Sequence, residues 1–140
     1  MTGRTETRWL QRLENFERAF GHLSAACHKG SYTDLERAGL VQMFEFSFEL
    51  AWKTGADLLS YEGYNVVSPR DVIRRAYEVG MVEDAELWLQ ALESRNRLTH
   101  TYDDATAREA EALIKNIYAP MIEKLLDSLR KRKPSIEQRR

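Results

Sequence analysis

The class of fold follows first from residues 9–27, which read WLQRLENFERAFGHLSAAC. Apolar side chains recur in this stretch at spacings of 4, 3, 4, 3 and 4: Trp9, Leu13, Phe16, Phe20, Leu23 and Cys27. Such spacing places them on one face of a helix, which can bury that face against other helices. We therefore predict a long amphipathic helix here, ended by Gly30.

Two helices are predicted to follow. The first begins at Thr33, because Thr33 with Glu36 three positions later forms a capping-box pattern, and it ends at Gly63, a residue that suits the position after a helix. The second is short and spans residues 68–80, where Pro69 takes the first helical position that proline tolerates. The intervening residues form a short connector.

The remaining chain predicts two more long helices. One runs from about Glu83 to the region of His100, and the other from Thr106 to about Lys133. Pro120 lies inside the last helix, where it removes a hydrogen bond and should bend the helix about one turn upstream. A kink is favoured over a break because the apolar stripe resumes in phase after it.

No segment alternates apolar and polar residues with period two, so no strand is assigned. The predicted fold class is all-α, an up-and-down four-helix bundle with an extra short helix. The chain has 140 residues, which fits one domain over residues 1–133. Residues 134–140 are expected to be a basic flexible tail, solvated or contacting phosphate.

Composition excludes several classes of protein. Lys and Arg number 21 against 22 Asp and Glu, so no global field would draw the chain to nucleic acid or a membrane, and any anion site must be local. No apolar run approaches the roughly 20 residues of a membrane span, and the first residues lack a signal core, so we expect a cytoplasmic protein. His22, Cys27 and His28 lack metal-ligand spacing; no metal and no cofactor are expected.

The apolar pattern of the fourth helix changes near its end. Trp88 and Leu92 mark its core face, and continuing the same spacing puts Arg95 and Asn96 on that face, with His100 just past its edge. Buried polar groups cost several kcal/mol when unpaired, so we expect them to meet partners, water or a ligand. The alternative is that the bundle ends here and the face becomes polar because it reaches solvent.

Residues 94–103, SRNRLTHTYD, resemble the R-x4-H-x-Y motif of HEPN domains, with Arg95, Asn96, His100 and Tyr102 at the motif positions. HEPN domains are small helical bundles that often act as RNases or as partners of minimal nucleotidyltransferases. Residues 44–53, FEFSFELAWK, and 68–73, SPRDVI, are similar to signatures of the HEPN branch called nucleotidyltransferase substrate-binding proteins. The likeness covers roughly residues 40–125.

The resemblance implies a metal-independent RNase in which Arg95 and His100 are the essential catalytic pair. An imidazole can exchange a proton with the ribose 2′-OH or the leaving 5′-oxygen, and a guanidinium can hold charge on the phosphorane. Asn96 would orient the imidazole or the phosphate, or instead cap the helix. The resemblance also implies that a partner nucleotidyltransferase attaches AMP to Tyr102 and silences the RNase. The alternative for Tyr102 is packing with its hydroxyl in water.

Arg95 and His100 lie about 140° apart around a regular helix, so one chain aims them poorly at one phosphate. Two copies related by a two-fold axis would bring both pairs to one groove, and we predict a homodimer. Glu45, Glu49 and Lys53 recur every four residues, which indicates an exposed charged ladder or, alternatively, a partner-binding surface.

Three functions remain open from the sequence. The first is an RNase toxin, inhibited by adenylylation of Tyr102, in a toxin–antitoxin pair with a minimal nucleotidyltransferase. The second is a non-catalytic substrate-binding subunit of that nucleotidyltransferase, and the third is a structural helical dimer. The chain has no nucleotidyltransferase motif of its own, so the transferase would be another protein. Besides a second copy and the nucleotidyltransferase, RNA is an expected partner under the first function; no membrane partner is expected.

Overall fold

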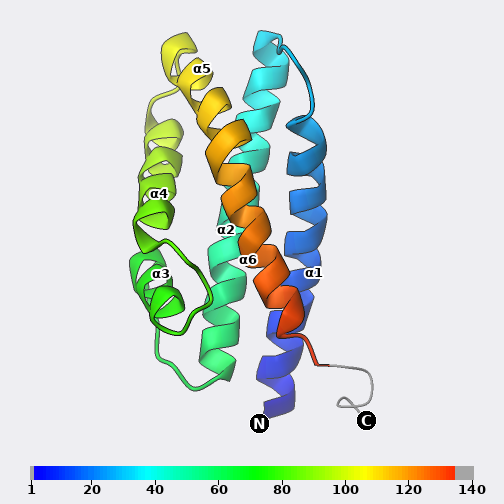
Figure 1. Cartoon of the computed structure of the whole chain (residues 1–140), viewed down its shortest axis with the longest axis vertical. Coiled ribbons are helices and arrows are strands. Elements are labelled where there is room, and N and C mark those ends of the chain that lie inside the picture. The colour runs from blue at the N-terminus through cyan, green and yellow to red at the C-terminus, as the bar shows by residue number, and fades with distance from the viewer. Residues whose placement is uncertain (1, 135–140) are drawn as a thin grey trace.

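The computed structural model describes residues 2–134, and these are helical without any strand (Figure 1). The predicted tail therefore lies, from residue 135 on, outside the described residues. Six α-helices and one π-helical segment follow in order: α1 (Thr2–Ala26), α2 (Asp34–Tyr61), α3 (Pro69–Glu78), α4 (Ala85–His100), α5 (Asp104–Leu113), η1 (Ile114–Tyr118) and α6 (Ala119–Lys131). The all-α prediction is confirmed. Within the described part of the chain, no helix is long and apolar enough to cross a membrane.

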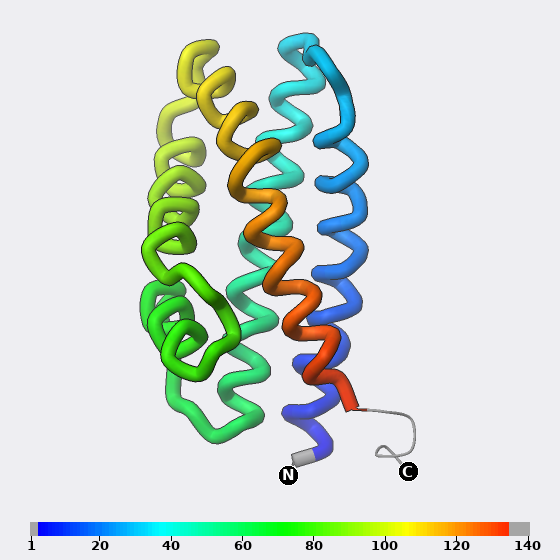
Figure 2. The backbone as a smooth tube through the Cα atoms, in the orientation of Figure 1, coloured from blue at the N-terminus to red at the C-terminus, as the bar shows by residue number. Residues whose placement is uncertain are grey.

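The long helices alternate in direction, as an up-and-down bundle requires. Figure 1 shows α1, α2, α4 and the continuous α5–η1–α6 rod running side by side, while the short α3 lies beside the beginning of α4. The tube in Figure 2 shows that short connections join these helices. Because each connection is short, consecutive helices pack as antiparallel neighbours.

The core is built mainly from the apolar face predicted for the first helix and the matching face of α2. Trp9, Leu13, Phe16, Phe20 and Leu23 are all buried, as the spacing predicts, whereas Cys27 follows the helix end and is only partly buried. On α2, the buried side chains recur along one stripe, including Leu40, Val41, Phe44, Phe48, Ala51, Leu58 and Leu59. Burial of these two faces against each other supplies the main hydrophobic stabilisation.

Most predicted helix ends agree with the structure. The Thr33 hydroxyl accepts a hydrogen bond from the Glu36 amide at 3.1 Å, and the Thr33 amide donates to the Glu36 carboxylate at 2.9 Å, so the capping box is present. Ser68 caps α3 with its hydroxyl alone, which accepts from the Asp71 amide at 3.2 Å. Gly63 has φ +98°, a conformation that side-chain-bearing residues rarely adopt, which explains glycine after α2.

Two predicted helix starts are wrong by one or two residues. The last helix begins at Asp104, and its N-cap is Asp103, whose carboxylate accepts from the Thr106 amide at 2.8 Å. Thr106 is therefore inside the helix. Likewise, α4 begins after the N-cap Asp84 rather than at Glu83. Aspartate caps a helix as well as serine or threonine, and nearby candidates compete.

The predicted kink takes the form of a π-helical segment. The wider turn at residues 114–118 lies immediately before α6, in whose first turn Pro120 sits without an amide donor. Tyr118 closes this segment: its ring stacks on Phe44 with centroids 5.4 Å apart, and its hydroxyl lies 2.8 Å from Ser94 Oγ. The segment thus connects the last helix to both α2 and α4.

Candidate functional site

The second half of α4 carries the residues singled out by the sequence. Leu98, which the helical-wheel argument did not place in the core, is buried, whereas Asn96 and His100 are exposed. The prediction that these two side chains enter the packed face is therefore wrong within one chain. Arg95 differs, because only 31% of its side chain is exposed. The core face of α4 drifts towards Leu98 because α5 packs against the end of α4.

Arg95 is held between α2 and α4. Its Nη2 lies 3.2 Å from a carboxylate oxygen of Glu49, and its Nη1 donates to Asn96 Oδ1 at 3.3 Å. The Nε atom is buried and has no hydrogen-bond partner within residues 2–134. Asn96 thus contacts Arg95, and the residue that caps the end of α4 is Thr101. The guanidinium, with five N–H donors, keeps donors for a further ligand.

Glu49 is the centre of a charged cluster on the side of α2 that faces α4. It accepts from Trp52 Nε1 at 3.1 Å and pairs with Lys53 at 3.2 Å, in addition to its contact with Arg95. Burial by itself would raise the pKa of Glu49, but the hydrogen bonds from Trp52 and Lys53 and the charge of Arg95 outweigh it, and the net pKa is lowered. Glu49 is therefore a carboxylate at neutral pH.

The ladder predicted on the exposed face of α2 lies in fact along the contact between α2 and α4. One turn before Glu49, the carboxylate of Glu45 accepts from the hydroxyl of Thr99 at 3.2 Å. Both glutamates are partly buried. Because α2 and α4 are antiparallel, Glu45 and Glu49 meet Thr99 and Arg95 in reverse order along the chain.

A groove of about 260 Å³ opens beside this cluster. It brings together three segments that are distant in sequence: Glu49 and Trp52 on α2, Ser68, Pro69 and Arg70 at the start of α3, and Leu92, Arg95 and Asn96 on α4. Sequence analysis identified residues 68–73 only as a family signature and did not include Arg70 in the site. The helix start was recognisable from Ser68 and Pro69, but its position against α4 is a tertiary feature.

His100 lies apart from this groove. It occupies the exposed last turn of α4, and no hydrogen bond or ion pair joins its side chain to another of residues 2–134. Arg95 instead contacts Glu49 and Asn96. A single chain therefore presents the predicted catalytic pair as two separate groups.

Tyr102 follows the end of α4 and is about half exposed. Burial raises the pKa of its hydroxyl, and the positive charge of Arg37 opposes this rise. Three carboxylates add to it: Asp34, Asp104 and Glu45. Tyr102 is therefore near the N-terminal half of α2, and it lies beyond the end of α4, which ends at His100.

Arg37 is the buried cation next to this tyrosine. Its Nε donates to Glu111 on α5 at 2.8 Å, and its Nη1 donates to Asp34 at 3.1 Å. Its Nη2 reaches the carbonyl oxygen of Tyr32 at 3.1 Å. With these partners Arg37 joins α2 to α5, so its role in the described chain is structural.

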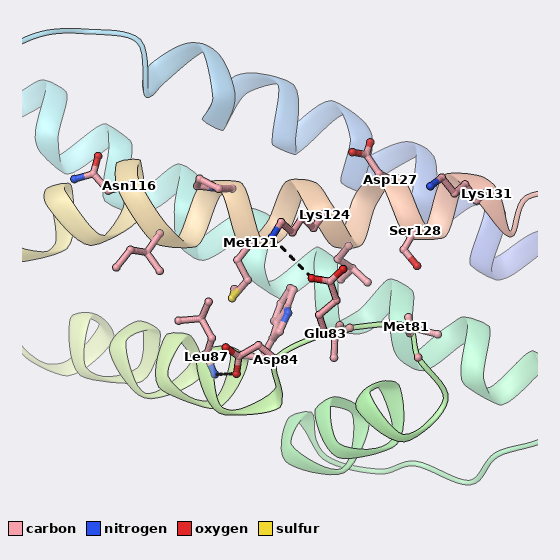
Figure 3. A pocket seen from close by; sticks show the side chains of 16 residues that line it. Met81, Glu83, Asp84, Leu87, Asn116, Met121, Lys124, Asp127, Ser128 and Lys131 are labelled. Atoms are coloured by element: carbon pink, nitrogen blue, oxygen red, sulfur yellow. Dashed lines mark hydrogen bonds and ion pairs between the residues drawn. The ribbon is translucent and has the colours of Figure 1, made fainter.

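A larger hollow, of about 670 Å³, lies elsewhere, between α6 and the connection from α3 to α4 (Figure 3). Glu83 and Lys124 approach each other across it at 3.9 Å. None of the motif residues lines it. Nor do residues 2–134 contain a cluster of three or more His, Cys, Asp or Glu side chains able to hold a metal ion.

Comparison with known proteins agrees with the fold. The family model described as "nucleotidyltransferase substrate binding protein like" matches residues 11–131. This chain belongs to the nucleotidyltransferase substrate-binding family. It is similar to the probable ribonuclease HepT of Haemophilus influenzae, with 31% identity over 102 residues and 68% of each chain covered.

Two solved structures share the bundle. A protein from Thermus thermophilus is 35% identical, with a TM-score of 0.75 over 82% of this chain and 98% of its own. A Haemophilus influenzae protein, whose structure is described as revealing the fold of a substrate binding domain of a nucleotidyltransferase, is 26% identical. Its TM-score is 0.74 over 84% of this chain and 98% of its own.

Proposed function

We propose that this protein is the partner subunit of a minimal nucleotidyltransferase and acts, as a homodimer, as a metal-independent endoribonuclease. Its RNase activity would be that of a toxin, and adenylylation of Tyr102 by the partner would inhibit it. The family and the similarity to a probable ribonuclease support the assignment. The observation that carries it is an exposed apolar face of α2 directly beside the motif-bearing edge of α4.

The outer face of α2, which points away from the protein's own core, carries apolar side chains that are exposed to solvent. Leu35, Met43 and Phe46 lie on this face with 83%, 38% and 62% of their surfaces exposed. Gly39 lies between them and has open space around it. A helix that is apolar also on the side facing away from its own core is suited to burial against another molecule. A glycine in the middle of that face permits close approach of a second helix.

A second copy is the occupant that fits the chemistry. In a two-fold dimer the same surface of both chains meets, so the α2 faces would pack on each other. Glu45 and Glu49 tie the neighbouring edge of α4 to α2, and the two motif edges would therefore flank the same interface. The dimer would therefore bring two Arg95 and two His100 side chains to one interface. A single chain has only one of each, and these two side chains lie apart.

The chemistry proposed for this composite site is transesterification. One His100 removes the proton from a ribose 2′-OH, whose oxygen attacks the adjacent phosphorus and forms a 2′,3′-cyclic phosphate. The bond from phosphorus to the 5′-oxygen breaks, and the second His100 protonates that leaving oxygen. Arg95 donates to the non-bridging oxygens as charge accumulates on them. Asn96, which accepts from Arg95 Nη1, helps to orient that guanidinium.

The position of Tyr102 suits control by a partner enzyme. The hydroxyl of this half-exposed side chain can attack the α-phosphorus of ATP on the nucleotidyltransferase, with release of pyrophosphate and of the phenolic proton. The attached AMP would lie near the N-terminal half of α2, close to Glu45 and Asp34. There its bulk and negative charge would obstruct both the interface and the approach of RNA.

A second candidate is a non-catalytic substrate-binding subunit. The ion pair between Arg95 and Glu49 favours it. A guanidinium that is already paired with a carboxylate stabilises the negative charge on a phosphorane less well. Under this candidate, the groove between α2, α3 and α4 would receive the molecule on which the nucleotidyltransferase acts. A purely structural dimer would use the α2 face alone.

One experiment separates these candidates. The wild type and His100→Ala are expressed without the neighbouring nucleotidyltransferase, and cleavage of RNA in EDTA and arrest of growth are compared. The RNase proposal expects cleavage by the wild type only; equal behaviour of the two proteins refutes it. For the tyrosine, intact mass after incubation with the nucleotidyltransferase and ATP should rise by AMP units in the wild type and in Tyr77→Phe, but not in Tyr102→Phe.

A further inference from the structure

Positive charge gathers around the groove although the whole chain is slightly acidic, with a net charge of −1. Arg70 and Arg95 line the groove from α3 and α4, and Lys53 pairs with Glu49 at its α2 side. Among the residues that line the groove, Arg70 and Arg95 are two cations and Glu49 is the one carboxylate. Such a local excess of positive charge attracts phosphate without any global field.

Arg70 is weakly engaged in the free protein. Its nearest carboxylate, Glu93, lies 4.0 Å from Nη2, and 49% and 70% of the two side chains are exposed. Exposed ion pairs at this distance contribute little, so the guanidinium can leave Glu93 for a better acceptor. Phosphate is such an acceptor, because its oxygens match the planar donor fork of arginine.

The groove also has the size and lining for a piece of a nucleic-acid strand. At about 30 Å³ per water molecule, 260 Å³ corresponds to about nine waters, which is room for a phosphate group with part of its ribose. Arg95 lines the groove from α4, and next to it Asn96 contributes an exposed amide. Together with Arg70 at the start of α3, these residues place hydrogen-bond donors of two helices along the same hollow.

We infer that this groove is a phosphate-binding subsite for single-stranded RNA, in which Arg70 binds the phosphate next to the one held by Arg95. The inference rests on the proposed function, since it extends the path of the RNA from the motif edge of α4 to the start of α3. Arg70 does not touch the reacting atoms. Its role is to hold the strand so that the scissile phosphate meets Arg95 and His100.

The test compares two substitutions on α3, each of which removes one positive charge. Arg70→Gln removes the groove cation, and Arg74→Gln removes an exposed arginine one turn later that does not line the groove. Both are made in the uncleaving His100→Ala background, and binding of a short fluorescent single-stranded RNA is measured by anisotropy at several salt concentrations. Thermal unfolding of each variant checks that the fold is intact.

Arg70→Gln should weaken binding about tenfold and reduce the slope of log K against log salt by about 0.7, the value for one phosphate contact on a single strand. Arg74→Gln should bind within about twofold of its parent, and Arg70→Lys should keep the salt slope while losing part of the affinity. Equal affinity and equal salt slope for the Arg70→Gln and Arg74→Gln proteins overturn the inference.

Cleavage assays distinguish failure of the phosphate-subsite inference from failure of the proposed RNase function. If the wild type cleaves RNA, His100→Ala does not, and Arg70→Gln cleaves with unchanged KM, the RNase stands and the subsite is refuted. If nothing cleaves but RNA binding depends on Arg70, the groove binds RNA and the catalytic proposal is wrong. Absence of RNA binding by the wild type refutes both.

Discussion

The hydroxyl of Tyr118 joins the π-helical segment to α4 at the residue next to Arg95. Its oxygen lies 2.8 Å from Ser94 Oγ, and the tyrosine is 1% exposed. Tyr118→Phe removes this one oxygen and leaves the ring stacked on Phe44. The substitution therefore tests a single hydrogen bond between two helices.

The expected cost follows from burial. A hydrogen bond between neutral groups contributes about 1 kcal/mol net, and Ser94 is only partly buried, so water can satisfy its hydroxyl after the change. Since the ring remains, no cavity larger than the lost oxygen forms. We expect the free energy of unfolding to fall by about 1 kcal/mol and the melting temperature by about 4 °C in a domain of this size.

The assay is a double-mutant cycle in urea with Tyr118→Phe, Ser94→Ala and both together. If the two hydroxyls bond each other, the double variant should lose little more than either single variant, with a coupling of at least about 0.5 kcal/mol. The m-value should stay constant, because the surface exposed on unfolding is unchanged. Ser60→Ala, at an exposed position on α2, is the control and should be neutral.

Two results would refute this reasoning. Additive losses from the two substitutions would show that the hydroxyls do not stabilise each other. No loss for Tyr118→Phe would show that the buried hydroxyl contributes nothing at the π-helical segment. In the proposed RNase, the same variant should also lower kcat more than it raises KM, because α4 would hold Arg95 less firmly.

Three further predictions rest on the same contacts. Phe44→Ala, in the buried stripe of α2, should destabilise the protein by about 3–5 kcal/mol in urea unfolding, because it leaves a cavity; a loss below about 1 kcal/mol would contradict the packing. If the proposed homodimer packs through the α2 face, Phe46→Glu on that face should yield a monomer in light scattering. Val67→Glu, at a still more exposed position in a connector, should leave the proposed dimer intact. Hydrogen bonds from the amide and hydroxyl of Thr106 lower the pKa of Asp103, so the stabilisation by this cap is complete above the unfolded value of about 3.9 and is lost as pH falls through the folded pKa. Thermal unfolding should therefore separate wild type from Asp103→Ala at about pH 6, with the gap narrowing below about pH 4; a gap that widens there would be contrary evidence.

Local signals predicted the helices well because they act over one or two turns. The apolar stripe of residues 9–27, the capping box at Thr33 and the disturbance before Pro120 all appear in the structure. Competition between adjacent caps explains the misplaced start at Thr106, since Asp103 occupies the position with its carboxylate.

The site was predicted less well because a helical wheel has no information about neighbouring helices. It placed Asn96 on the packed face, but the packing of α5 and α2 around α4 buries Leu98 and leaves Asn96 in solvent. The four-residue spacing of Glu45, Glu49 and Lys53 likewise left an exposed ladder or a partner-binding surface open, whereas the contact between α2 and α4 pairs Glu49 with Arg95.

By itself, then, the amino-acid sequence determined an all-helical bundle, its family and the motif residues Arg95, His100 and Tyr102. Only the tertiary structure decided that Glu49 and Arg70 lie beside Arg95 and that His100 lies apart from them. The physical reason is the distance along the chain over which each signal acts. Periodicity and capping depend on residues three or four positions apart, whereas the contacts between α2, α3 and α4 depend on how whole helices pack against one another.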